Sequence, residues 1–233
     1  DRVGGRVRTD TVEGFRLDRG FQVLLTAYPE TQRELDYDAL GLHAFRDGAL
    51  VRYNGRFHRI ADPRRHPLDA PRTLFAPIGS LADKLRILRL RRTLARNSLP
   101  QVMERPEHTT LEALRTRWGF SSAMIDRFFR PFFGGIFFDR TLEASSRMFE
   151  FVFKMFAEGR TVLPAGGIDQ MPRQMRQHLP GKAVRLNAPV DAVEAPSVTL
   201  RDGETLEAPH VVVATEAPEA NRLVGDVTPT EGR

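Results

Sequence analysis

Two adjacent glycines followed by an arginine form the first candidate ligand-binding segment. Gly4 and Gly5 stand directly before Arg6 in the opening sequence DRVGGRVRTD. Glycine lets the backbone approach a ligand closely, and its N–H groups can point at phosphate oxygens. The forked guanidinium of arginine suits the same phosphate. Most Gly-Gly-Arg tripeptides are ordinary turns, so this one indicates a phosphate site only in company with other segments.

A second glycine pair, Gly166 and Gly167, lies in the sequence LPAGGIDQMP. It predicts a flexible turn leading into a helix, which Asp169 can cap and Pro172 can open. Strand-like segments follow. In one of them, Val190 and Val193 form the pattern V-x-x-V. Ordinary sheet core is the alternative interpretation of these valines.

Phenylalanine is concentrated between Ile125 and Phe156, a stretch that contains ten. The simpler interpretation is a plain core, because an aromatic stripe at helical spacing usually packs inside. The alternative is an apolar cavity for a hydrocarbon-like or aromatic substrate, opening toward the Gly166–Gly167 turn. The residues predicted to line that cavity are Phe132, Phe133, Phe137 and Phe153.

No acid–base pair or metal site is evident. The six histidines are scattered, without a Ser-His-Asp order or metal-ligand spacing, and cysteine is absent. Any redox chemistry would therefore depend on a bound cofactor. The catalytic residues stay unknown, and no metal is predicted.

The order of segments predicts an α/β (α+β) chain in which a mostly helical lobe interrupts a β-containing lobe. One strand that leads into the core is expected over 14–25. Further strands are expected at 183–187, 189–194, 197–201 and 204–208, and a buried parallel-type strand at 210–214. The predicted division is a first part of the β lobe over 1–30, a helical lobe over 31–160, a second part over 161–224 and a tail over 225–233.

One helix is predicted over 80–97, capped by Ser80, with Leu81, Leu85 and Leu88 near one face and Leu94 a further candidate for it. Its other face is rich in arginine, at positions 86, 89, 91 and 92. A solvated surface helix is the simpler interpretation. The alternative is a helix that lies on a membrane surface.

The net charge is +5 and the pI about 10.2, which suits an anionic partner. No nucleic-acid-binding signature accompanies this charge, so we expect no nucleic acid. No apolar run reaches the length of a membrane span, and no signal peptide opens the sequence. The expected location is the cytoplasm, with peripheral membrane contact left open.

Three segments resemble the superfamily of FAD-dependent amine oxidases and phytoene-desaturase-like flavoproteins. They are DRVGGRVRTDTVEGFRLDRGFQVLLTAYPE, LPAGGIDQMPRQMRQHLP together with VRLNAPVDAVE, and HVVVATEAPEANRLV. The resemblance implies a partial Rossmann-like FAD-binding lobe around a substrate-binding lobe. It implies FAD contacts from Gly4, Gly5, Arg6, Gly20, Ala165, Gly166, Gly167, Val190 and Ala214.

The resemblance also implies a G-x-G-x-x-G turn and a C-terminal flavin motif, and neither is present in these 233 residues. We therefore expect a fragment that binds FAD weakly or not at all. In an intact relative, a small apolar or amine substrate would transfer hydride to the flavin. The alternatives are a non-enzymatic remnant or a basic module that binds membrane surfaces. The substrate, the electron acceptor and the oligomeric state are not predicted.

Overall fold

The computed structural model describes residues 1–19, 23–62 and 65–225, and the chain forms two compact units. The larger unit is Arg6–Met175, and the smaller one joins Asp1–Gly5 to Arg176–Arg233. These boundaries do not coincide with the predicted lobes at 30 and 160. The prediction that 1–30 and 161–224 act as one cofactor-binding lobe stays a prediction.

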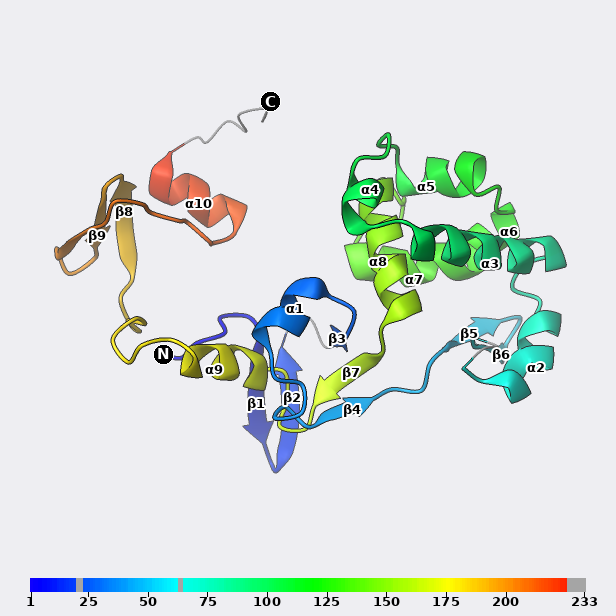
Figure 1. Ribbon diagram of the computed structural model, residues 1–233, viewed down its shortest axis with the longest axis horizontal. Coiled ribbons are helices and arrows are strands. Elements are labelled where there is room, and N and C mark those ends of the chain that lie inside the picture. The colour runs from blue at the N-terminus through cyan, green and yellow to red at the C-terminus, as the bar shows by residue number, and fades with distance from the viewer. Residues whose placement is uncertain (20–22, 63–64, 226–233) are drawn as a thin grey trace. The chain divides into compact units, whose positions relative to one another are not determined.

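The strands of the larger unit are all paired antiparallel within the described residues (Figure 1). β1 (Arg8–Val12) and β2 (Phe15–Arg19) form one hairpin, and β5 (Ala49–Tyr53) and β6 (Arg56–Ile60) form another. A three-stranded sheet has β7 (Thr161–Pro164) between β3 (Leu24–Leu25) and β4 (Leu42–Ala44). Segments from before and after the long helical region thus share one sheet.

The helical region contains the main apolar core, which Phe129, Phe133 and Phe149 fill together with leucines and Trp118. The helices of this unit are α1 (Pro29–Glu34), α2 (Ala70–Phe75) after a 3-10 turn at Pro67–Asp69, α3 (Leu81–Arg96), α4 (Leu99–Met103), α5 (Thr110–Glu112), α6 (Ser122–Met124), α7 (Arg130–Phe137) and α8 (Ser146–Glu158), with π-helical turns at Ala113–Arg117 and Ile125–Phe129. α9 (Gln170–Gln177) crosses the boundary between the units.

Helix α3 confirms the helix predicted over 80–97, and its N-terminus shows why the sequence folds there. The Ser80 hydroxyl accepts from the backbone N–H of Asp83, and the Asp83 carboxylate accepts from the backbone N–H of Ser80. This reciprocal pair satisfies two donors at the helix start. The predicted apolar face was wrong for three of its four leucines. Leu94 is buried as predicted, but Leu81, Leu85 and Leu88 are exposed, and the buried Leu90 was not in the prediction. Burial follows the side that packs on α8, which the spacing of leucines within α3 does not reveal.

Asp83 is fully buried and also ties α3 to the loop before α6. Its carboxylate accepts from the backbone N–H of Ser121 at 2.9 Å and from the Ser121 hydroxyl at 2.6 Å. Burial by itself would raise the pKa of Asp83, but the hydrogen bonds from Ser121 and Ser80 outweigh burial and lower the pKa to about 2. The ionised carboxylate therefore stabilises the fold.

We expect Asp83→Asn to lower the free energy of unfolding by about 2 kcal/mol near neutral pH. Because the folded-state pKa lies below the ordinary value, this stabilisation is present above pH 4 and is lost as pH falls toward 2. Urea unfolding at several pH values measures the difference, which should be about half as large near pH 3. Asp126→Asn, at an exposed position of the same lobe, is the control. A difference that does not change with pH would contradict this role.

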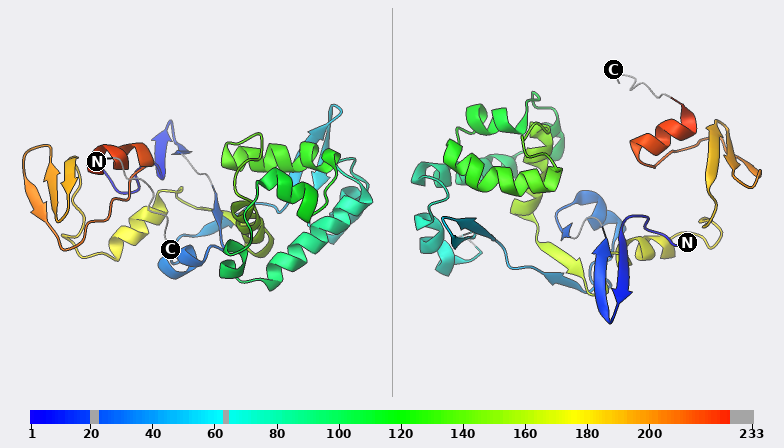
Figure 2. Two further views of the ribbon diagram at one scale, coloured as in Figure 1. Left: turned by 90° about the horizontal axis from the view of Figure 1, so that it is seen from above. Right: turned by 180° about the vertical axis from the view of Figure 1, so that it is seen from behind.

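The smaller unit contains a three-stranded antiparallel sheet and one helix. The sheet has the order β10 (Thr205–Glu207), β9 (Ser197–Leu200) and β8 (Val190–Glu194), and α10 (Ala217–Val224) lies against β8. Arg222 on α10 donates to the carbonyls of Val190 and Asp191. Figure 2 shows this sheet and helix from two further sides.

The strands predicted at 189–194, 197–201 and 204–208 are confirmed, and two others were wrong. Residues 183–187 and 211–214 have no strand structure, and Val212 is 86% exposed. A strand needs a hydrogen-bonding neighbour, and no described segment pairs with 211–214. An apolar run predicts the tendency to form a strand but does not supply the neighbour.

Candidate functional site

The Gly4–Gly5 turn has a backbone conformation that requires glycine. Both residues adopt positive φ, 102° at Gly4 and 54° at Gly5, which side chains disfavour. Nothing lies within 4 Å of the position that a Cβ of Gly5 would occupy, so open space adjoins the turn. Arg6 follows with an exposed side chain. Gly4 and Gly5 belong to the smaller unit and Arg6 to the larger one.

The turn at Ala165–Gly167 is held by hydrogen bonds within the protein. The N–H of Ala165 donates to Leu40 O, that of Gly166 to the Gln170 side chain at 2.8 Å, and that of Gly167 to Pro164 O. Arg16 donates to the carbonyl of Ala165 at 2.5 Å. These N–H groups are already used, so this turn can offer a ligand a close-packed surface rather than hydrogen-bond donors.

Thr9 and Asp18 hold the same turn from the β1–β2 hairpin, and the sequence analysis did not identify them. They lie directly opposite each other in the hairpin, where the Thr9 hydroxyl donates to Asp18 Oδ1 at 2.5 Å. Asp18 Oδ1 accepts from the N–H of Ile168 at 3.0 Å, and Thr9 Oγ1 accepts from the N–H of Asp169 at 3.2 Å. A polar pair on facing strands was the available signal, but the turn that it binds is about 150 residues away in sequence.

Of the remaining predicted FAD contacts, two lie in the smaller unit and one lies outside the residues that the structure describes. Gly20 is outside the described residues. Val190, half-buried on β8, and Ala214, exposed in the extended segment 211–214, belong to the smaller unit with Gly4 and Gly5. The structure thus brings Ala165, Gly166 and Gly167 together in one turn of the larger unit, and the role of all nine residues at FAD stays a prediction.

The phenylalanines predicted to line a substrate cavity pack against one another. Phe133 is 1% exposed and contacts the rings of Phe132, Phe137 and Phe149, with centroid distances of 4.8–5.7 Å. Phe132, Phe137 and Phe153 are half-buried against this core. Phe133 is therefore a core residue, and a substrate would meet only the exposed parts of the other three rings. Their role in a substrate pocket stays a prediction.

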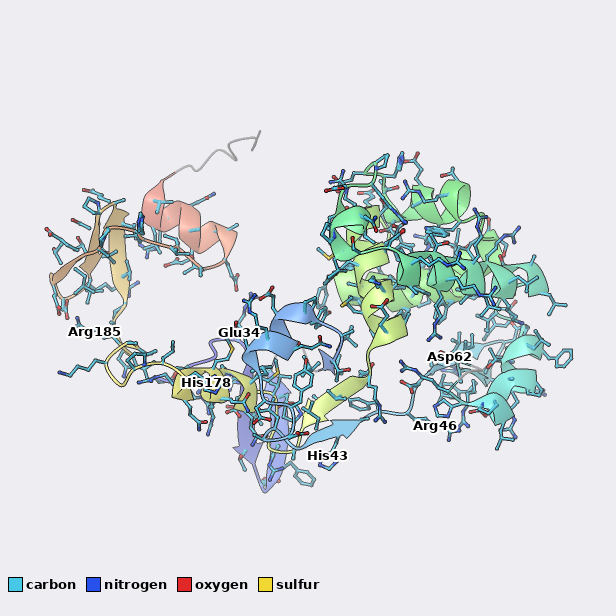
Figure 3. All side chains as sticks on the ribbon, in the orientation of Figure 1. Glu34, His43, Arg46, Asp62, His178 and Arg185 are labelled. Carbon is cyan, nitrogen blue, oxygen red and sulfur yellow. The ribbon has the colours of Figure 1, made fainter. Side chains whose placement is uncertain are left out.

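The histidine, aspartate and glutamate side chains of the described residues do not group as a metal site. None of the histidines is buried. The described helices include none that is both long and apolar enough to cross a membrane. Figure 3 shows His43 on β4, and Arg46 and Asp62 near the β5–β6 hairpin and α2.

Residues 1–231 match the family described as flavin containing amine oxidoreductases, and the chain belongs to that family. A search of curated proteins gave no match.

Solved structures with a similar fold include two redesigned variants of putrescine oxidase. A triple mutant is 20% identical with a TM-score of 0.64 over 96% of this chain, and a double mutant is 19% identical with the same score over 99%. A reduced UDP-galactopyranose mutase is 15% identical with a TM-score of 0.55 over 97% of this chain. The chain spans only about half of those chains, 52%, 54% and 50%.

Proposed function

We propose that the chain forms part of an FAD-dependent oxidoreductase that oxidises a small apolar or amine substrate. The observation that carries the proposal is the match of residues 1–231 to the flavin containing amine oxidoreductase family. Open space beside Gly5 and the exposed guanidinium of Arg6 next to it support phosphate binding at this segment.

Each predicted contact has a distinct task in this proposal. Gly4, Gly5 and Arg6 would bind phosphate, and Val190 would pack at the adenine end. The turn at 165–167 would support the cofactor through its shape, because its N–H groups are already bonded. Bound flavin would supply the acceptor for hydride, and the protein would orient the substrate and exclude water.

The substrate class has two alternatives, and each has its own support. The amine alternative follows from the family and from the similarity to putrescine oxidase. The apolar alternative follows from the phenylalanine-rich lobe and from the segment RPFFGGIFFDRTLEASSRMFEF, which resembles the desaturase-like branch. Phenylalanine makes no hydrogen-bonding demand on a substrate, so both alternatives place the apolar part of the molecule there.

The test uses a longer chain in which a G-x-G-x-x-G unit precedes residue 1 and a C-terminal flavin motif follows. Without oxygen, this protein is mixed in turn with amines and with apolar hydrocarbons that contain allylic C–H bonds. Loss of the visible absorbance of oxidised flavin would support the proposal and identify the substrate class. A protein that binds FAD but is not reduced by either class would contradict it.

A second candidate, a basic module that binds membrane surfaces, is favoured by the charge of one segment of the larger unit and by a hollow on the surface of that unit. Residues 46–96 contain 13 of the 35 Lys and Arg but only 4 of the 30 Asp and Glu, a net charge of +9. A surface hollow of about 460 Å³ is lined by exposed Leu50, Phe57 and Phe75 together with Arg59 and Arg72. Apolar side chains that insert and arginines that bind phosphates are the two components of binding to an anionic bilayer.

We expect the chain to sediment with phosphatidylglycerol vesicles at low salt and to be released at high salt, because exposed charges are screened. The double variant Phe57→Ala and Phe75→Ala should weaken binding about tenfold or more, since both rings are largely exposed. Phe15→Ala, at an exposed ring on the β1–β2 hairpin, is the matched control. Equal binding to neutral vesicles, or no binding, would contradict the membrane role.

A further inference from the structure

The pair formed by Thr9 and Asp18 is here called the Thr9–Asp18 clamp. It makes more hydrogen bonds than the pairing of β1 with β2 requires. Cross-strand polar pairs in a hairpin usually satisfy each other or water. This pair also accepts hydrogen bonds from two backbone N–H groups of a turn that is distant in sequence, those of Ile168 and Asp169. Thr9 is 7% exposed and Asp169 5%. The contact is therefore mostly shielded from water.

Gly167 lets this turn approach the Thr9–Asp18 clamp more closely than a residue with a side chain could. A Cβ at Gly167 would lie 2.4 Å from Thr9 Oγ1 and 2.5 Å from Thr9 Cγ2. Thr9 is β-branched and held in a strand, so it cannot easily move aside. Gly167 also has a φ of 99°, which disfavours any side chain. Shape and hydrogen bonding thus fix the turn at one position on β1.

The clamp connects two segments that are far apart in sequence. Arg6 lies three residues before Thr9, so fixing β1 also restricts the start of that strand and the residue that would bind phosphate. On the other side, the clamp fixes the backbone of 165–169, with Arg16 of β2 holding the carbonyl of Ala165. Any ligand that needs both Arg6 and this turn depends on the clamp for their spacing.

We infer that Thr9 and Asp18 are positioning residues of the flavin site, which hold the 165–169 turn at a fixed place on the strand that follows Arg6. This inference rests on the proposed FAD-binding function. It assigns to the two residues an effect on cofactor affinity without direct contact. The threonine hydroxyl is the critical group, because it is both the donor to Asp18 and the acceptor from Asp169.

The test compares Thr9→Val, which keeps the shape but removes the hydroxyl, with Thr9→Ser, which restores it. In the 233-residue chain without FAD, Thr9→Val should speed hydrogen exchange at the N–H groups of Ile168 and Asp169. In the longer chain that binds FAD, it should raise the dissociation constant for FAD about tenfold, the size of one lost hydrogen bond. Thr9→Ser should return both quantities close to those of the unsubstituted protein.

Two controls separate positioning from loss of stability. Thr11→Val makes the same change at an exposed position on the same strand and should alter neither quantity. Glu150→Gln, in the helical core, should lower stability more strongly than Thr9→Val but leave FAD affinity unchanged. An unchanged FAD affinity in Thr9→Val would overturn this inference alone. Failure of the unsubstituted longer chain to bind FAD would overturn the proposed function together with it.

Discussion

Glu150→Gln is expected to lower the free energy of unfolding by about 3 kcal/mol, although glutamine has nearly the same size. Glu150 lies on α8 among phenylalanines, and its side chain is 1% exposed. Its carboxylate accepts from Arg105 at 2.5 Å, from Arg117 at 3.2 Å and from the indole N–H of Trp118 at 3.2 Å. Removing its charge leaves two arginines without their counter-charge, and breaking a buried ion pair in this way typically costs 3–5 kcal/mol.

Trp118 makes this prediction simple to measure, because it is the single tryptophan of the chain and is 4% exposed. Unfolding in urea can be followed by its fluorescence, with the exposed Glu143→Gln as the control. The control should change stability by less than about 0.5 kcal/mol. A loss below about 1 kcal/mol in Glu150→Gln would show that the arginines are stabilised by water instead.

The ion-pair cluster at Glu150 also shows what the sequence could not reveal. Phenylalanines on both sides of Glu150 predict a buried helix, and α8 confirms that. Yet Arg105 and Arg117 come from the segments before α8, and only the packed structure shows that they surround the carboxylate. A glutamate within an apolar helix indicates a buried partner but does not identify it.

Local signals predicted the elements well where the residues responsible lie close in sequence. Ser80 and Asp83 define the start of α3, and Asp202 and Gly203 form the short turn between the predicted strands β9 and β10. Signals that depend on distant neighbours failed. Leu90 of α3 packs inside although the prediction left it out, and no strand of the described residues lies beside 211–214 as a parallel sheet requires.

In the candidate site too, local features could be predicted and contacts between distant segments could not. The two glycine pairs were evident because their conformations are local, and positive φ at Gly4, Gly5 and Gly167 agrees with the need for glycine. Thr9 and Asp18 were missed because their common target is a turn about 150 residues later. Phe133 was assigned to a pocket although its ring is enclosed by other rings, because composition does not distinguish a filled core from a cavity lining.

The second large effect concerns FAD itself: the 233-residue chain is expected to bind it with a dissociation constant above about 10 µM. The resemblance to FAD-dependent amine oxidases implies a G-x-G-x-x-G turn, which would place the diphosphate at a helix N-terminus, and an acidic residue on the ribose; no G-x-G-x-x-G occurs in this sequence. Three or four charge-assisted hydrogen bonds are then missing, at about 1.5–3 kcal/mol each, which amounts to several decades of affinity. The Gly4–Gly5 turn and Arg6 would supply only part of the phosphate contacts.

Titration of the chain with FAD, followed by flavin fluorescence, measures this affinity directly, and the longer chain should bind at sub-micromolar concentrations. In that longer chain, Arg6→Ala should weaken binding about tenfold or more, because a guanidinium–phosphate contact is a strong charge-assisted pair. Arg33→Ala, at an exposed position on α1, should not change it. Tight binding by the 233-residue chain would show that its own glycine turns and Arg6 suffice for the diphosphate. The missing G-x-G-x-x-G turn would then not be required, and the flavin site would be built mainly from the residues described above.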